Sequence, residues 1–153
     1  MGDWQSDPVK REVAKVIVAF FEAGKNKDLP HLGDFHSDRG SFTKFDENPP
    51  YTRQNSEEAF VYEQASFANI SDYSYELVDL RIDVFGAVAV ATFYLSTKGM
   101  FVNDYSFEGS TVSSRSRVTM VLVDTGAGWR IAHEHFSSFP DLPKNPSSKT
   151  LRR

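Results

Sequence analysis

The residues from 75 to 139 form a nearly unbroken series of β-strand patterns, which constrains the fold more than any other feature of the chain. Apolar and charged residues alternate almost strictly over 75–85, as is typical of a strand with one face in water. Three more strand patterns follow, at 87–102, 110–124 and 129–139. Gly86 and the segment 125–128 suit tight turns, so we expect four long antiparallel strands. The segment 87–102 is apolar on both faces and is predicted to be central.

The residues before this series have mainly helical patterns. Apolar residues recur at spacings of three and four over 8–25, which predicts an amphipathic helix. Asp7 suits the N-cap of this helix, and Pro8 suits its first position. Shorter helices are predicted at 28–36 and 55–70, with a short strand at 40–47 between them.

This order of elements predicts an α+β fold, in which three N-terminal helices pack on a strongly curved antiparallel sheet to form a cone. A chain of 153 residues is long enough for one domain with a sizeable core. We expect an N-terminal extension at 1–7, the domain at 8–139 and a disordered tail at 140–153, where prolines interrupt a polar segment.

Composition narrows the classes of function. A formal net charge of −4 argues against broad binding to nucleic acid or to anionic membranes. The absence of cysteine removes disulfides, thiolate metal sites and a cysteine nucleophile. Because the start is not a signal peptide and no apolar run could span a bilayer, we expect a cytoplasmic protein. The aromatic content of 14% suggests a bulky core or an aromatic-lined cavity.

The last predicted strand carries a His-x-His pair within the run DTGAGWRIAHEHFSS, which follows SRVTMVLV. Together with the order of elements over residues 9–139, this run resembles the SnoaL-like branch of the NTF2-like superfamily. It also resembles the association domain of calcium/calmodulin-dependent protein kinase II, a member of that superfamily. The resemblance implies a cone whose open end holds a small molecule, and a homodimer that pairs through its sheets. Some members are cofactor-free enzymes and others are assembly modules, so the fold does not fix the function.

Alternation along the last strand places Trp129, Ile131, His133, His135 and Ser137 on one face. A hairpin that pairs Val123 with Trp129 would set Thr119 opposite His133 and Arg117 opposite His135, although a bulge would change this register. The histidines could form a metal site if His36, Asp38 or Glu63 supplied a third ligand. They could also act in acid–base chemistry, bind a ligand without chemistry, or hydrogen-bond Thr119, Ser137 and the backbone, at a dimer interface or within the sheet.

Glu134 lies on the opposite face of the same strand, which we expect to face the pocket. Val118, Met120, Ala132 and Phe136 would surround it and could raise its pKa, making it a general base. The alternative is a salt bridge to Arg115, Arg117 or Arg130, or simple exposure. The kinase association domain has pocket arginines where this sequence has Met120 and Phe136, so that anion-binding pocket is not expected here.

The candidate catalytic residues are therefore His133, His135 and Glu134. The candidate ligand-binding residues are Tyr62, from the helix that roofs the cavity, and Arg117, Thr119, Glu134 and Phe136. No resident metal or cofactor is expected. The resulting hypothesis is a homodimer whose cone binds a small apolar or carbonyl-bearing molecule, with isomerase- or cyclase-type acid–base chemistry. The alternative is a non-enzymatic dimerisation or assembly module with a vestigial pocket filled by aromatic side chains.

Overall fold

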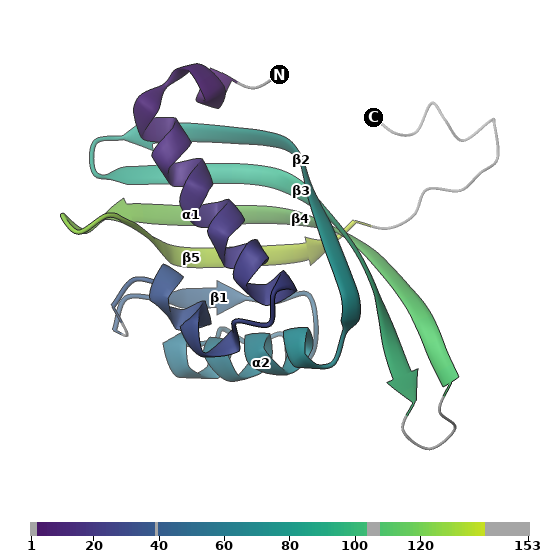
Figure 1. The fold of residues 1–153 in the computed structure, drawn as a ribbon. Helices are drawn as coiled ribbons and strands as arrows, with labels where there is room; N and C mark the ends of the chain where they lie inside the picture. The colour runs from purple at the N-terminus through teal and green to yellow at the C-terminus, as the bar shows by residue number, and fades with distance from the viewer. Residues whose placement is uncertain (1–2, 39, 104–107, 140–153) are drawn as a thin grey trace.

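The computed structural model describes residues 3–38, 40–103 and 108–139 (Figure 1). The N-terminal part holds a short 3-10 helix η1 (Asp3–Ser6), helix α1 (Pro8–Lys25), a 3-10 segment η2 (Leu29–Phe35), strand β1 (Thr43–Phe45) and helix α2 (Ser56–Ala68). Four long strands follow, β2 (Ser71–Phe85), β3 (Val88–Asn103), β4 (Glu108–Asp124) and β5 (Trp129–Ser138). The predicted tail at 140–153 lies outside the described residues.

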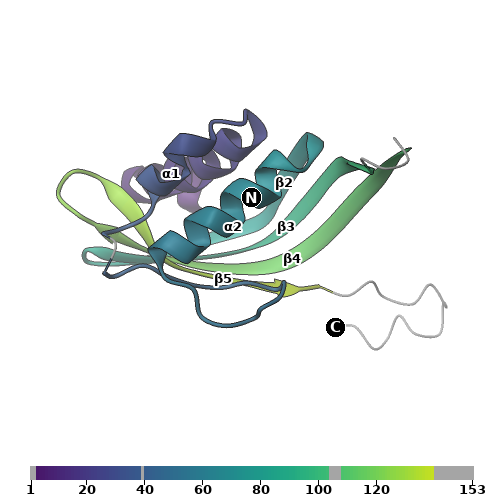
Figure 2. The same cartoon turned by 90° about the horizontal axis from the view of Figure 1, so that it is seen from below.

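The described strands form one sheet in the order β1-β5-β4-β3-β2. The four long strands are antiparallel as predicted, whereas β1 pairs in parallel with β5. The sheet is curved, and both α1 and α2 cover its concave face (Figure 2). This arrangement confirms the α+β cone, with the apolar core between the helices and the concave face.

The prediction of three N-terminal helices is only partly matched. Residues 29–35 form a 3-10 segment instead of an α-helix, because Pro30 and Gly33 fall within only seven residues and no side chain caps the start. Helix α2 follows β1, so the helices are not all N-terminal to the sheet. This order places β1 at the edge of the sheet beside β5, directly above α2 in Figure 1.

The two α-helices begin where their capping residues predict. The Asp7 side chain accepts hydrogen bonds from the backbone N–H groups of Val9 and Lys10 at the start of α1. Helix α2 begins with a capping box, in which Asn55 and Glu58 accept from each other's backbone N–H. One face of α1 is buried against the sheet, at Val13, Ala14, Ile17, Phe20, Phe21, Ala23 and Gly24.

The predicted register of the last hairpin is wrong by one residue at the turn, where Trp129 pairs with Asp124 and not with Val123, and a β-bulge then shifts it by one more. Trp129 pairs with Asp124 and Ile131 with Leu122, but His133 pairs with Val121, which leaves Ala132 as the extra residue. The bulge breaks the simple alternation along β5. Ile131 and Glu134, three residues apart, are therefore both fully buried.

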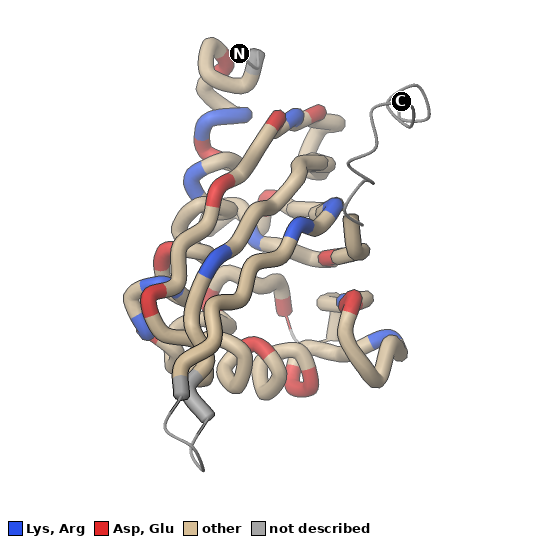
Figure 3. The backbone as a smooth tube through the Cα atoms, turned by 90° about the vertical axis from the view of Figure 1, so that its right-hand side faces the viewer, with Lys and Arg blue, Asp and Glu red and all other residues tan. Residues whose placement is uncertain are grey.

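Charged residues of both signs are spread over helices and strands (Figure 3). Among the described residues, no helix is both long enough and apolar enough to cross a membrane.

Candidate functional site

A cavity of about 440 Å³ lies between α2, the concave face of the sheet and the loop that follows β1. Its apolar wall is largely aromatic and includes Phe20, Phe21, Phe67, Tyr73, Phe101 and Phe136. Its polar lining includes Lys44, Asp46, Glu47, Glu63, Arg115 and Ser116. The cone is therefore not filled by its own aromatic side chains, as the vestigial-pocket alternative would require.

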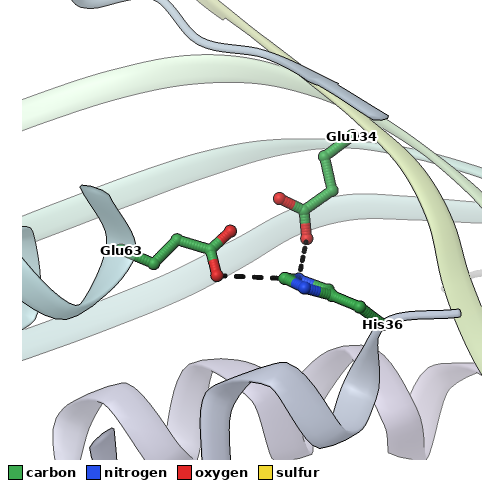
Figure 4. Close-up of side chains that lie close together, drawn as sticks. All are labelled: His36, Glu63 and Glu134. Atoms are coloured by element: carbon green, nitrogen blue, oxygen red, sulfur yellow. Dashed lines mark ion pairs between the residues drawn. The ribbon is translucent and has the colours of Figure 1, made fainter. Parts of the chain in front are cut away.

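Four charged or titratable side chains meet at the floor of this cavity and form a closed ring, which we call the buried ring: His36, Lys44, Glu63 and Glu134. The Lys44 Nζ lies 3.0 Å from Glu63 Oε2 and 3.4 Å from Glu134 Oε1. The His36 Nε2 lies 3.4 Å from Glu134 Oε2 and 3.6 Å from Glu63 Oε1. Figure 4 shows both carboxylates directed at the His36 ring.

Each member of the buried ring comes from a different part of the fold. His36 ends η2, and its ring stacks on Phe42 at a centroid distance of 3.9 Å. Lys44 is the central residue of β1 and pairs with Glu134 of β5 in the sheet. Glu63 points inward from α2, where it is buried together with Ala59 and Phe67. The four residues are spread over almost a hundred positions of the sequence and meet only in the folded structure.

Burial and ion pairing set the charge of each member. Burial lowers the pKa of His36, but the nearby carboxylates of Glu134 and Glu63 outweigh this and leave the pKa above its ordinary value. Burial also disfavours the Lys44 ammonium, but Glu63 and Glu134 together raise its pKa. The pKa of Glu134 is lowered, since Lys44 and His36 outweigh its burial. For Glu63, burial outweighs the opposing attraction of Lys44 and raises the pKa to about 7.

His36, Glu63 and Glu134 also have the donor atoms of a divalent-metal site, with one ligand atom from each lying within 4.8 Å of the others. The Lys44 ammonium contacts both of these carboxylates and already supplies the positive charge that they require. A divalent cation in the same place would face this ammonium at short range. We therefore interpret the cluster as an ion-paired ring.

Among the residues singled out in the sequence, Tyr62 and Phe136 line the cavity. Glu134 is fully buried on the same side of the sheet, beneath the cavity floor, with no exposed surface. Its neighbours on the paired strand include Met120 and Val118, as expected. Its ionic partner is Lys44, which the sequence did not suggest, and none of the predicted arginines.

The structure places His133, His135, Arg117 and Thr119 together on the convex face, away from the cavity. His135 pairs with Thr119 across the strands, and Arg117 Nε donates a 3.1 Å hydrogen bond to Ser137 Oγ. His133 Nδ1 lies 2.8 Å from the Thr43 hydroxyl. The side-chain partner of His133 is therefore Thr43 of β1, whereas the expected partners were Thr119 and Ser137. His36 and Glu63, considered above as a third metal ligand for this pair, lie on the other side of the sheet.

Three members of the buried ring were missed or misplaced in the analysis of the sequence. Lys44 was treated only as part of a short strand, although its alternation with Thr43 and Phe45 places it on the same face as the buried Phe42. His36 and Glu63 were considered only as partners of His133 and His135.

The model of the SnoaL-like domain family matches residues 13–141 of the chain. The protein belongs to the SnoaL-like family. No curated protein sequence matches it.

Solved structures extend this likeness at the level of the fold. A candidate dehydratase of the NTF2-like family from Streptomyces avermitilis is 21% identical, with a TM-score of 0.72 over 86% of this chain and 96% of that one. An uncharacterised protein with a cystatin-like fold from Caulobacter vibrioides is 17% identical, with a TM-score of 0.70 over 95% and 96%. The S. rosetta CaMKII hub is 23% identical, with a TM-score of 0.66 over 87% and 98%. At these identities the likeness shows the NTF2-like fold alone.

Proposed function

We propose that this SnoaL-like protein binds a small, largely apolar, uncharged carbonyl compound in the cone and moves a proton on it without a cofactor. The observation that carries this proposal is the position of Glu63. Glu63 lines an aromatic cavity, only 4% of the surface of its side chain is exposed, and its carboxylate is backed by an ammonium group at 3.0 Å.

Glu63 would exchange the proton with the bound molecule. A pKa of about 7 suits a group that must both accept and donate protons near neutral pH. When its carboxylate takes a proton from the carbon beside a carbonyl, the C–H electron pair becomes part of an enolate. The fixed positive charge of Lys44 then compensates the negative charge of that enolate. Return of the proton at another carbon gives an isomer, so the step needs no oxidant or reductant.

Hydrogen exchange into a neutral cyclic ketone tests this proposal. The protein would be incubated in deuterium oxide with a small panel that includes 2-tetralone, and loss of the α-proton signal would be followed by NMR. We expect the wild type to accelerate exchange, and Glu63→Gln to lose this acceleration while keeping its fold. Exchange at the same rate with both proteins, for every ketone that binds, would contradict the role of Glu63.

We also propose that two copies pair through the convex face of the sheet. This face carries partly exposed apolar side chains: Phe45, at 36% of its surface, lies beside the histidines, and Tyr94 at 41% and Val78 at 40% lie on β3 and β2. Phe45 contacts the rings of both His133 and His135. The relative described as a CaMKII hub supports assembly as a role for this fold. Light scattering tests it, and a monomer at micromolar concentration would count against it.

A further inference from the structure

We propose that His36 and Glu63 share one proton within the buried ring, so that His36, which a ligand in the cavity does not touch, sets the charge of Glu63. His36 is thus a positioning residue and Glu63 is the residue that contacts the ligand. The sharing is a property of the ligand-free protein. Its use in catalysis rests on the function proposed above.

The geometry of the ring carries this proposal. Acidic and basic groups alternate around it, and each carboxylate contacts both cations. The single nitrogen His36 Nε2 faces both Glu134, at 3.4 Å, and Glu63, at 3.6 Å. Neither contact has the geometry of a hydrogen bond, so a transfer between His36 and Glu63 requires a small approach of the two side chains, as is common in ligand-free sites.

The charge balance of the ring allows one shared proton. Lys44 and Glu134 form a fixed pair of opposite charges, which cancel. If one further proton resides on either His36 or Glu63, the whole ring is neutral. Without that proton its charge is −1, and with two it is +1, and net charge is costly at a site that water cannot reach. Of the titratable groups in the described residues, Lys44, Glu134 and His36 face Glu63 directly, and Asp46 acts on it through Lys44.

The two residues that share the proton differ in their access to the cavity. The His36 side chain is 1% exposed, is absent from the cavity lining, and packs between Phe42 and Phe20. Its Nδ1 has no hydrogen-bond partner among the described side chains and backbone. Glu63, in contrast, lines the cavity. With the proton on His36, Glu63 is a carboxylate and can act as a base; with the proton on Glu63, it can act as an acid. The Glu63 carboxyl group can therefore take a proton from one position of a ligand and give a proton to another.

A carbon-13 NMR titration of the full ligand-free chain tests the sharing. The signals of the Glu63 carboxyl carbon and the His36 ring would be followed against pH in the wild type. We expect each signal to show both steps of a coupled titration, at the same two pH values. In His36→Gln, the Glu63 curve should become a single step, and its pKa should rise by about one pH unit or more. In Glu63→Gln, the pKa of His36 should fall by the same amount.

His31→Gln is the matched control, because His31 is an exposed histidine paired with Asp28. It should leave the Glu63 titration unchanged. An unaltered Glu63 curve in a folded His36→Gln protein would overturn the proposal. If that variant does not fold, wild-type curves without a common inflection would overturn it equally well. Because no ligand is involved, failure of ketone exchange would reject the proposed function and leave the shared proton standing.

Discussion

Replacing Lys44 with methionine tests whether the buried ring depends on its ammonium group. Methionine fills a similar volume, so the change removes the charge with little loss of packing. The ammonium contacts two carboxylates, at 3.0 and 3.4 Å, and also lies 4.8 Å from the centre of the Phe136 ring. Removing it leaves Glu63 and Glu134 with only His36 to compensate their charge.

The expected loss of stability follows from these contacts. Each contact has a gross attraction of about 5 kcal/mol at the dielectric typical of protein sites. The loss of this attraction is partly offset, because the methionine variant avoids the free-energy cost of removing an ammonium group from water on folding. We therefore expect a net loss of about 3–5 kcal/mol at about pH 8, as for other buried ion pairs that lose one partner.

The loss should be smaller in acid. Without Lys44, the folded-state pKa of Glu63 rises further above its unfolded value, because the ammonium no longer opposes the effect of burial. The corresponding stability is fully present at low pH and is lost as the pH rises through the folded-state pKa. At about pH 5 the loss should therefore shrink by about 1–2 kcal/mol.

Urea unfolding followed by circular dichroism measures this difference. Lys98→Met, at an exposed position on β3, is the control and should change stability by no more than about 0.5 kcal/mol. A loss below about 1 kcal/mol for Lys44→Met, equal at both pH values, would show that the ring does not depend on its ammonium.

Three further predictions concern other features of the molecule. The pKa of Glu63 rises from 4.5 to about 7 on folding, so its contribution to wild-type stability should be present below about pH 4.5 and lost as the pH rises through 7. This change amounts to up to about 3 kcal/mol, and urea titrations should show that Glu63→Gln abolishes it. Gly99→Ala should lower the melting temperature, because a Cβ there would overlap the Ile70 side chain, whereas Gly40→Ala should not, since nothing lies within 4 Å of its Cβ; equal effects would refute this packing. Val90→Asp should dissociate or aggregate the proposed dimer in light-scattering experiments, because Val90 pairs with Val121 beside His133 on the convex face, and an undisturbed dimer would place the interface elsewhere.

Much of the fold was accessible from local patterns. The spacing of apolar residues in α1 and the side chain of Asp7 predict that helix to the residue, because both signals act within one or two turns. The four long strands follow from alternation and from the turn at Gly86, whose φ of 65° suits glycine. The 3-10 form of η2 and the parallel pairing of β1 with β5 depend on tertiary contacts, which local patterns do not contain.

The candidate site was less accessible, because it depends on a bulge and on contacts between segments far apart in the sequence. The bulge at Ala132 means that Trp129 and Ile131 do not share a face with His133 and His135, and no local signal marks it. Glu134 and Phe136 were assigned to the correct face, since no bulge separates them. The meeting of His36, Lys44 and Glu63 depends on how η2, β1 and α2 pack, so only the structure could show it.

Methyl-labelled NMR with 2-tetralone tests most directly whether the floor of the cone, and not the His-x-His pair, is the binding site. Leu95, Ile70 and Val112 line the cavity, and their methyl signals should shift as the ketone is added. Val121, which pairs with His133 on the convex face, should not shift. Shifts confined to Val121 and the His133 and His135 rings, with the three cavity residues unaffected, would contradict a site in the cone.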